Sequence, residues 1–129
     1  MTVTPIQKLL ETARAEITTL SIEDAMREVD SGSALFVDIR DIRELQREGR
    51  IENAFHAPRG MLEFWVAPDS PYHKPELSDG RRLILFCASA WRSALSTKTL
   101  QDMGLDNVAE LEGGFKAWVA AGNAVVKPD

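Results

Sequence analysis

The residue best suited to chemistry is Cys87, which directly follows the apolar run 83–86. The next residues are small, and Arg92 and Ser93 then begin a predicted helix. Small side chains let the backbone curl so that amide N–H groups point at the sulfur, and such nests beside a helix N-terminus hold anions. The amides and the Arg92 charge favour the thiolate, so we expect the pKa of Cys87 to lie below about 8.5. The predicted cysteine loop consists of Cys87, Ala88, Ser89, Ala90, Trp91, Arg92 and Ser93.

A simpler interpretation is that Cys87 is inert. A lone cysteine after an apolar strand is commonly a small buried side chain that only packs. The position of Cys87 favours the reactive interpretation, because packing alone does not call for a cysteine at a strand end, five residues before an arginine. No histidine lies near Cys87 in the sequence, so activation is expected to come from the loop itself.

Composition narrows the class of protein. The chain has 129 residues, of which 44% are hydrophobic and 27% charged, as in an ordinary globular domain. A net charge of -5 argues against nucleic-acid binding. No apolar run approaches the roughly 18 residues that span a bilayer, and residues 1–16 lack a signal-peptide pattern, so we expect a cytoplasmic protein without membrane contact. With one cysteine and two histidines, neither a disulfide within the chain nor a metal site is expected, and we predict no cofactor.

Helix-like and strand-like segments alternate along the chain. The apolar run 34–37 is typical of a buried strand in a parallel sheet. The segment 82–86, which is continuously apolar over 83–86, is the best candidate for the central strand, and 108–111 is another expected strand. The expected helices span 21–29, 41–48, 60–66, 93–103 and 115–120, and a further short strand spans 54–57. This order predicts an α/β fold with a mostly parallel sheet.

An extra helix is expected at the N-terminus, over residues 5–16, with Ile6, Leu9, Leu10 and Ala13 at helical spacing. We therefore predict a helical extension over residues 1–16 and a single domain over residues 17–129.

The polar residues that follow the strand-like runs indicate where a site should lie. Asp38, His56, Cys87 and the pair Gly113 and Gly114 all come after such a run. Ligands of open α/β sheets bind beyond the carboxyl ends of the strands. We therefore expect these residues to meet at one edge of the sheet.

Four segments resemble, in order, the motifs of the rhodanese family. Residues 87–92 resemble its Cys-x-x-x-x-Arg active-site loop, and residues 35–40, with Glu44 shortly after, resemble its Val-Asp-x-Arg segment. Residues 49–58 resemble its Gly-His-Ile-x-Gly-Ala-x-x-x-Pro segment, and residues 111–118 its Gly-Gly-x-x-x-Trp segment. The chain departs from the pattern at Arg50 and Asn53, where the family usually has His and Gly, and the loop lacks the family's usual glycine.

This resemblance implies a rhodanese-like fold, which consists of a five-stranded parallel sheet with helices on both faces. It also implies that the protein is a sulfurtransferase. Cys87 would take a sulfane sulfur from a small donor, such as thiosulfate or a persulfide, and hold it as a persulfide. It would then pass the sulfur to cyanide or to a thiol acceptor, either a small molecule or a protein. Such covalent storage predicts ping-pong kinetics. The loop amides would stabilise the terminal sulfur, and Arg92 would bind an anionic donor.

Four other residues are candidates near the site. Arg59 is a possible second cation of the substrate pocket. Asp38 and Arg40 are expected to form a structural ion pair, and His56 to be a hydrogen-bonded structural residue rather than a base.

Two alternatives remain open. One is a cysteine-based phosphatase or arsenate reductase. Related phosphatases place five residues between Cys and Arg, whereas this chain has the four residues 88–91. A shorter loop makes a tighter cradle, which suits one added sulfur rather than a tetrahedral oxyanion. The other alternative is a non-catalytic rhodanese-like binding module, in which Cys87 only packs.

Overall fold

The computed structural model describes residues 2–128 and shows an α/β fold with a five-stranded parallel sheet. The strands are β1 (Thr19–Leu20), β2 (Ala34–Asp38), β3 (Phe55–His56), β4 (Arg82–Phe86) and β5 (Val108–Leu111). The helices are α1 (Ile6–Glu16), α2 (Ile22–Asp30), α3 (Ile42–Glu48), α4 (Leu62–Val66), α5 (Trp91–Asp102) and α6 (Gly114–Ala120). Short 3₁₀ turns span Arg59–Met61 and Pro75–Ser78. Within residues 2–128, no helix has the length and apolar character to cross a bilayer.

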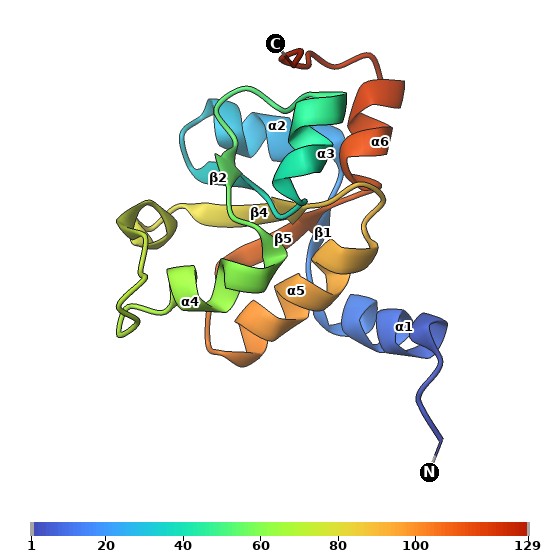
Figure 1. Cartoon of the computed structure of the whole chain (residues 1–129), viewed down its shortest axis with the longest axis vertical. Coiled ribbons are helices and arrows are strands. Elements are labelled where there is room, and N and C mark those ends of the chain that lie inside the picture. The colour runs from blue at the N-terminus through green and yellow to red at the C-terminus, as the bar shows by residue number, and fades with distance from the viewer. Residues whose placement is uncertain (1, 129) are drawn as a thin grey trace.

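The strand order is β1-β5-β4-β2-β3, and every neighbouring pair is parallel. Helices α2, α3 and α6 lie on one side of the sheet and α1, α4 and α5 on the other (Figure 1). The sequence-based prediction of a parallel sheet with helices on both faces is thus confirmed. Because parallel strands need crossover connections, all strand ends that lead into the helices fall on the same edge.

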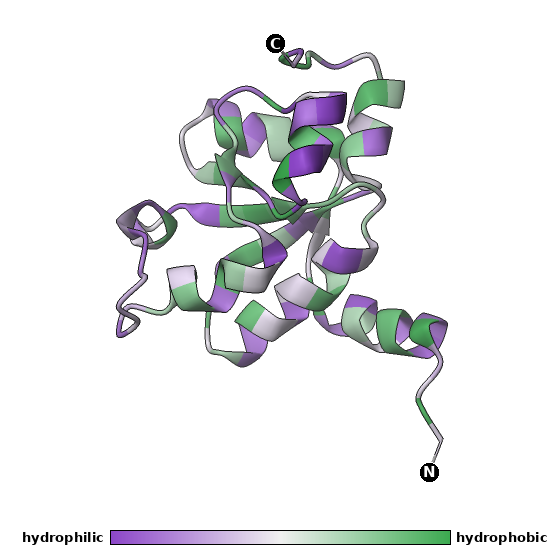
Figure 2. Cartoon of the chain, viewed as in Figure 1, coloured by the Kyte–Doolittle hydropathy of each residue, from purple (hydrophilic) through white to green (hydrophobic). Residues whose placement is uncertain are grey.

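Two hydrophobic cores form on the two faces of the sheet. Strand β4 supplies both, because its side chains alternate: Leu83 and Leu85 pack with Cys87 in one core, and Ile84 and Phe86 pack in the other. The central strands are predominantly hydrophobic, whereas the helices carry hydrophilic stripes (Figure 2). Cys87 therefore continues the alternation of β4 and faces the α5 side.

Most predicted elements occur where expected. The bounds of β4 and β5 match the apolar runs, and Ser21 caps α2 by accepting a hydrogen bond from the Asp24 amide at 3.1 Å. Strand β1 and the turn Pro75–Ser78 were not predicted. Both are too short to show a periodic pattern.

The N-terminal helix α1 packs on α5. Leu10 and Ala13 are buried, while Ile6 and Leu9 remain about half exposed, so the predicted apolar face is only partly covered. The end of α1 is tied to α5 by polar contacts. Lys98 forms an ion pair with Glu16 at 2.7 Å, and the Gln101 side chain donates to the Glu16 carbonyl at 2.8 Å.

Candidate active site

The carboxyl ends of the central strands bring the candidate residues to one edge. Asp38 is in register with Phe86 on one side and with His56 on the other. Cys87 follows Phe86 directly, so the thiol lies at the centre of this edge. Gly113 and Gly114 follow β5, the strand on the other side of β4.

Helix α6 holds the beginning of the cysteine loop (residues 87–93). The Phe115 amide donates to the Cys87 carbonyl at 2.8 Å, and the Lys116 amide donates to the Ala88 carbonyl at 3.0 Å. In a trans peptide unit the C=O and N–H groups point in opposite directions. Turning these two carbonyls towards α6 therefore directs the following amides, those of Ala88 and Ser89, away from it.

Gly114 allows this close approach. A Cβ atom on Gly114 would lie 2.6 Å from the Cys87 carbonyl oxygen and 2.9 Å from the Ala88 carbonyl carbon and oxygen. The φ of Gly114 is +67°, which also favours glycine. The Gly-Gly pair of the sequence is therefore what lets α6 support the loop.

Ala90 makes the turn from the loop into α5. It has φ 70° and ψ 14°, a left-handed conformation that L-residues adopt at some cost. The sequence lacks the family's usual loop glycine, and here the chain makes the turn with an alanine. The free amides at the start of the 12-residue helix α5 face the loop side, where the helix dipole favours negative charge.

The surroundings of Cys87 favour its thiolate. The residue is 1% exposed, and burial by itself raises the pKa of the thiol. Hydrogen bonding with the Ser93 hydroxyl, whose oxygen lies 3.6 Å from the sulfur, acts in the opposite direction, as do the amides of Ser93 and Ser89 and the Arg92 charge. Together they outweigh burial, so the pKa of Cys87 lies below its ordinary value.

Arg92 forms a doubly hydrogen-bonded ion pair with Glu44 of α3. The capping box of α3 positions this glutamate: Asp41 accepts from the Arg43 amide, and Glu44 accepts from the Asp41 amide at 2.9 Å. The Arg92 hydrogen bonds, followed by smaller effects, hold the pKa of Glu44 at about 2, so it is ionised at neutral pH. The same hydrogen bonds raise the pKa of Arg92.

A buried ion pair between Arg40 and Asp38 lies at the carboxyl edge of the sheet. The guanidinium of Arg40 is fully buried, donates to Asp38 at 2.8–3.2 Å and to the Gly49 carbonyl at 2.9 Å, and lies 4.0 Å from the ring centroid of Phe115. His56 Nε2 lies 2.7 Å from the Arg40 carbonyl oxygen. Arg40 thus links the α3 segment to α6, which in turn holds the loop.

The remaining predicted residues lie at the surface. Ser89 and Arg59 are exposed, and Trp91, the first residue of α5, is 48% exposed. Within residues 2–128, Arg59 forms no hydrogen bond or ion pair with the cysteine loop. Its role in substrate binding therefore stays a prediction.

The sequence did not predict the roles of three polar residues near the loop. Glu44, noted only as part of a motif, is the partner of Arg92, and Arg14 of α1 donates to the Ala90 carbonyl at 3.2 Å. Glu110, in β5, is fully buried and accepts a hydrogen bond from the Ser93 hydroxyl at 2.8 Å. A carboxylate inside a short, otherwise apolar strand was the one available signal for Glu110.

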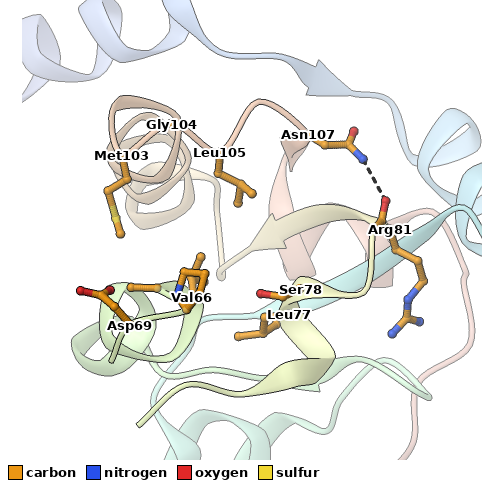
Figure 3. Close-up of a pocket in the computed structure, with 12 residues that line it drawn as sticks. Val66, Asp69, Leu77, Ser78, Arg81, Met103, Gly104, Leu105 and Asn107 are labelled. Carbon is orange, nitrogen blue, oxygen red and sulfur yellow. Dashed lines mark hydrogen bonds between the residues drawn. The ribbon is translucent and has the colours of Figure 1, made fainter. Parts of the chain in front are cut away.

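A cavity of about 550 Å³ lies elsewhere, between α4, the turn Pro75–Ser78 and the end of α5 (Figure 3). Arg81 and Asn107 in its lining directly precede β4 and β5. The cavity is therefore at the amino edge of the sheet, opposite to Cys87. None of residues 87–93 lines it.

Comparison with known families decides the classification. The model of the rhodanese-like domain matches residues 21–121. The chain belongs to the rhodanese-like family. Rhodanese-like proteins are commonly sulfurtransferases.

Relatives and solved structures agree with this assignment. A sulfurtransferase of Allochromatium vinosum is 29% identical over 105 residues, covering 81% of this chain and 90% of its own. The polysulfide-sulfur transferase homodimer of Wolinella succinogenes is 27% identical with a TM-score of 0.71, covering 95% of this chain and 88% of its own. A Rhodopseudomonas palustris protein of unknown function, described as a possible tyrosine phosphatase, is 45% identical with a TM-score of 0.90, covering 97% of this chain and 96% of its own.

Proposed function

We propose that this protein is a sulfurtransferase that carries a sulfane sulfur as a persulfide on Cys87. The observation that carries the proposal is the position of the thiol. It lies at the carboxyl edge of the sheet, in a loop whose Ser93 hydroxyl, amides and neighbouring Arg92 lower its pKa against the effect of burial. The family and its sulfurtransferase members support the same chemistry.

The reaction has two steps. The Cys87 thiolate forms an S–S bond with the outer sulfur of a donor such as thiosulfate, while the bond from that sulfur to the sulfonate breaks and sulfite leaves with the electron pair. An acceptor thiolate, of a small molecule or a protein, then attacks the terminal sulfur and leaves as a persulfide, which restores the Cys87 thiolate. The loop amides hold the negative terminal sulfur between the two steps. A reducing compartment such as the cytoplasm suits this free thiol.

Phosphate ester hydrolysis is the competing function, because the similar Rhodopseudomonas palustris protein is described as a possible tyrosine phosphatase. Two observations favour sulfur transfer. The loop has only four residues between Cys87 and Arg92. Glu44 is also unsuited to protonate a leaving group, because its pKa is about 2.

Intact-mass measurement tests the proposal. Thiosulfate should add the mass of one sulfur atom to the wild type, and cyanide or dithiothreitol should remove it. The Cys87→Ser variant should take up none. Hydrolysis of an aryl phosphate without sulfur uptake, lost in Cys87→Ser, would establish the phosphatase instead. A wild type that neither takes up sulfur nor hydrolyses the ester would indicate a binding module.

A further inference from the structure

Glu110 is a buried carboxyl group that the sulfur-transfer steps do not use. It lies in the middle of β5, between Ala109 and Leu111, and all three residues are fully buried. An isolated buried carboxylate is costly, so such groups are paired, hydrogen-bonded or protonated. Within residues 2–128, Glu110 forms no ion pair. Its side-chain carboxyl group accepts hydrogen bonds from two hydroxyl groups, those of Ser93 and Thr19.

These hydroxyls connect Glu110 to the nucleophile. Ser93 Oγ lies 2.8 Å from Glu110 Oε1, and Cys87 Sγ lies 3.6 Å from the same Ser93 oxygen. On the other side, Thr19 Oγ1 of β1 donates to Glu110 Oε2 at 3.2 Å. The thiol, the Ser93 hydroxyl and the carboxyl group therefore form one continuous hydrogen-bonded chain.

We propose that Glu110 is a positioning residue that receives the proton of Cys87 through the Ser93 hydroxyl, so that thiol and carboxyl share one negative charge. The proposal rests on Cys87 being the nucleophile of the proposed function, and not on the identity of the sulfur donor.

The proton transfer balances within the three groups. With Glu110 ionised, the thiol donates to Ser93 and Ser93 donates to the carboxylate. When the thiol proton passes to the Ser93 oxygen, the original Ser93 proton passes to Glu110. The chain is then reversed: the neutral carboxyl donates to Ser93, and Ser93 donates to the thiolate. No charge leaves the buried cluster.

The environment brings the two acids closer in strength. Burial, followed by smaller opposing effects of the hydrogen bonds from Ser93 and Thr19 and of the Arg14 charge, raises the pKa of Glu110. The pKa of Cys87 is lowered despite its burial, as described above. Proton exchange between two groups is easiest when their pKa values approach each other.

The other charges around the pair come from three elements. Arg14 of α1 donates a hydrogen bond to the Ala90 carbonyl of the loop. The charge of Arg92 of α5 lowers the pKa of the Cys87 thiol, and Arg92 is itself paired with Glu44 of α3. Glu112 follows β5 and is exposed. Arg14, Glu110 and Glu112 all line a cavity of about 320 Å³, together with Ser89, Ala90 and Gly113.

Coupling between the Cys87 thiol and the Glu110 carboxyl group should be visible in their titration with pH. Two interacting acids lose their protons in two macroscopic steps that belong to the pair. The first proton leaves to create the shared charge, which gives partial thiolate over a broad plateau. The second leaves only at higher pH, because it adds a second negative charge to a buried cluster.

Alkylation of Cys87 by iodoacetamide measures the thiolate directly, because the chain has no other cysteine. The rate is followed from about pH 4 to about pH 10, the range in which carboxyls and thiols titrate. The wild type should show two inflections. Glu110→Gln should show a single inflection, at least about one pH unit below the upper one of the wild type, which is a tenfold rise in the acid dissociation constant. The amide keeps the size of the side chain but takes no proton.

Glu112→Gln is the matched control, since it removes an exposed carboxylate from the same segment and the same cavity. Its profile should coincide with that of the wild type. A single wild-type inflection shared by Glu110→Gln, or an equal shift in Glu112→Gln, would overturn the proposal. Neither result depends on sulfur uptake, so failure of the proposed function is measured separately by intact mass.

A reciprocal measurement needs no change at Glu110. The side-chain carboxyl carbon resonance of Glu110 is followed against pH in the wild type and in Cys87→Ser, whose hydroxyl does not ionise in this range. We expect two steps in the wild type and one in Cys87→Ser. Identical titration of Glu110 in both proteins would refute the shared proton.

Discussion

Arg92 and Glu44 form a doubly hydrogen-bonded ion pair, with Nη1 2.8 Å from Oε2 and Nη2 2.9 Å from Oε1. The pair joins the first turn of α5 to the first turn of α3. Arg92 is one-third exposed and Glu44 is 17% exposed, so the pair is partly shielded from solvent. The positive charge of Arg92, which acts on Cys87, is therefore held in a fixed position by Glu44.

Removing the Arg92 side chain should lower turnover most with anionic sulfur donors. We expect Arg92→Ala to lose at least about tenfold in turnover with thiosulfate, consistent with one charge-assisted contact of about 1.5–3 kcal/mol. Turnover with a neutral persulfide donor should fall less. Arg47→Ala is the control, because it removes an exposed positive charge of α3 that pairs with Glu48. Equal losses with both donors would show that Arg92 mainly shapes the loop.

The ion pair should make stability depend on acid pH. The pKa of Glu44 falls from 4.5 to about 2 on folding. Because the folded value is the lower one, ionised Glu44 contributes stability above about pH 4.5, and this is lost as the pH falls towards about 2. Allowing for solvent screening, we expect Glu44→Gln to be less stable than the wild type by about 2 kcal/mol at neutral pH.

Urea unfolding of both proteins across this pH range measures the difference in free energy of unfolding. The difference should shrink between about pH 4.5 and about pH 2. A difference that stays constant with pH would mean that the glutamate acts through its shape or through the helix cap.

The sequence predicted the parts of this site that depend on neighbours along the chain. The apolar runs before Asp38 and Cys87, and the Gly-Gly pair after β5, locate the carboxyl edge because strand ends can be read locally. The partners of Arg92 and Ser93 could not be predicted in this way. Glu44 and Glu110 are 48 and 17 residues away, and only the packing of α3 and β5 brings them close.

Strand β1 was missed for a related reason. Its two residues show no pattern of their own, and its place is set by pairing with β5, where Thr19 is in register with Glu110. That pairing also delivers the Thr19 hydroxyl to the buried carboxyl group. The element hardest to predict thus completes the surroundings of Glu110.

The left-handed alanine of the loop should be replaceable. Ala90→Gly removes the strain of φ 70° but adds chain entropy to the unfolded state. Ala88→Gly adds the same entropy without relieving a positive φ, so it is the matched control. We expect Ala90→Gly to be more stable than Ala88→Gly by about 1–2 kcal/mol, the cost of the left-handed conformation. Equal stabilities in thermal unfolding would contradict the strain at Ala90.

The close contact between Gly114 and the cysteine loop should not tolerate an added methyl group. Gly114→Ala places a methyl carbon within 2.6–2.9 Å of backbone atoms of Cys87 and Ala88, which have no flexible end that can move aside. Gly122→Ala is the control: its φ of +82° is also positive, but nothing lies within 4 Å of the added carbon. Both variants carry the cost of an unfavourable φ, so their difference isolates the clash.

We expect Gly114→Ala to be less stable than Gly122→Ala by about 1–3 kcal/mol, the usual cost of overpacking. It should also lose sulfur uptake by intact mass, because the Cys87 and Ala88 carbonyls can no longer reach the α6 amides, and the loop amides then turn away from the sulfur. Gly122→Ala should take up sulfur normally. If Gly114→Ala matched its control in both stability and sulfur uptake, helix α6 would not be what holds the loop in shape.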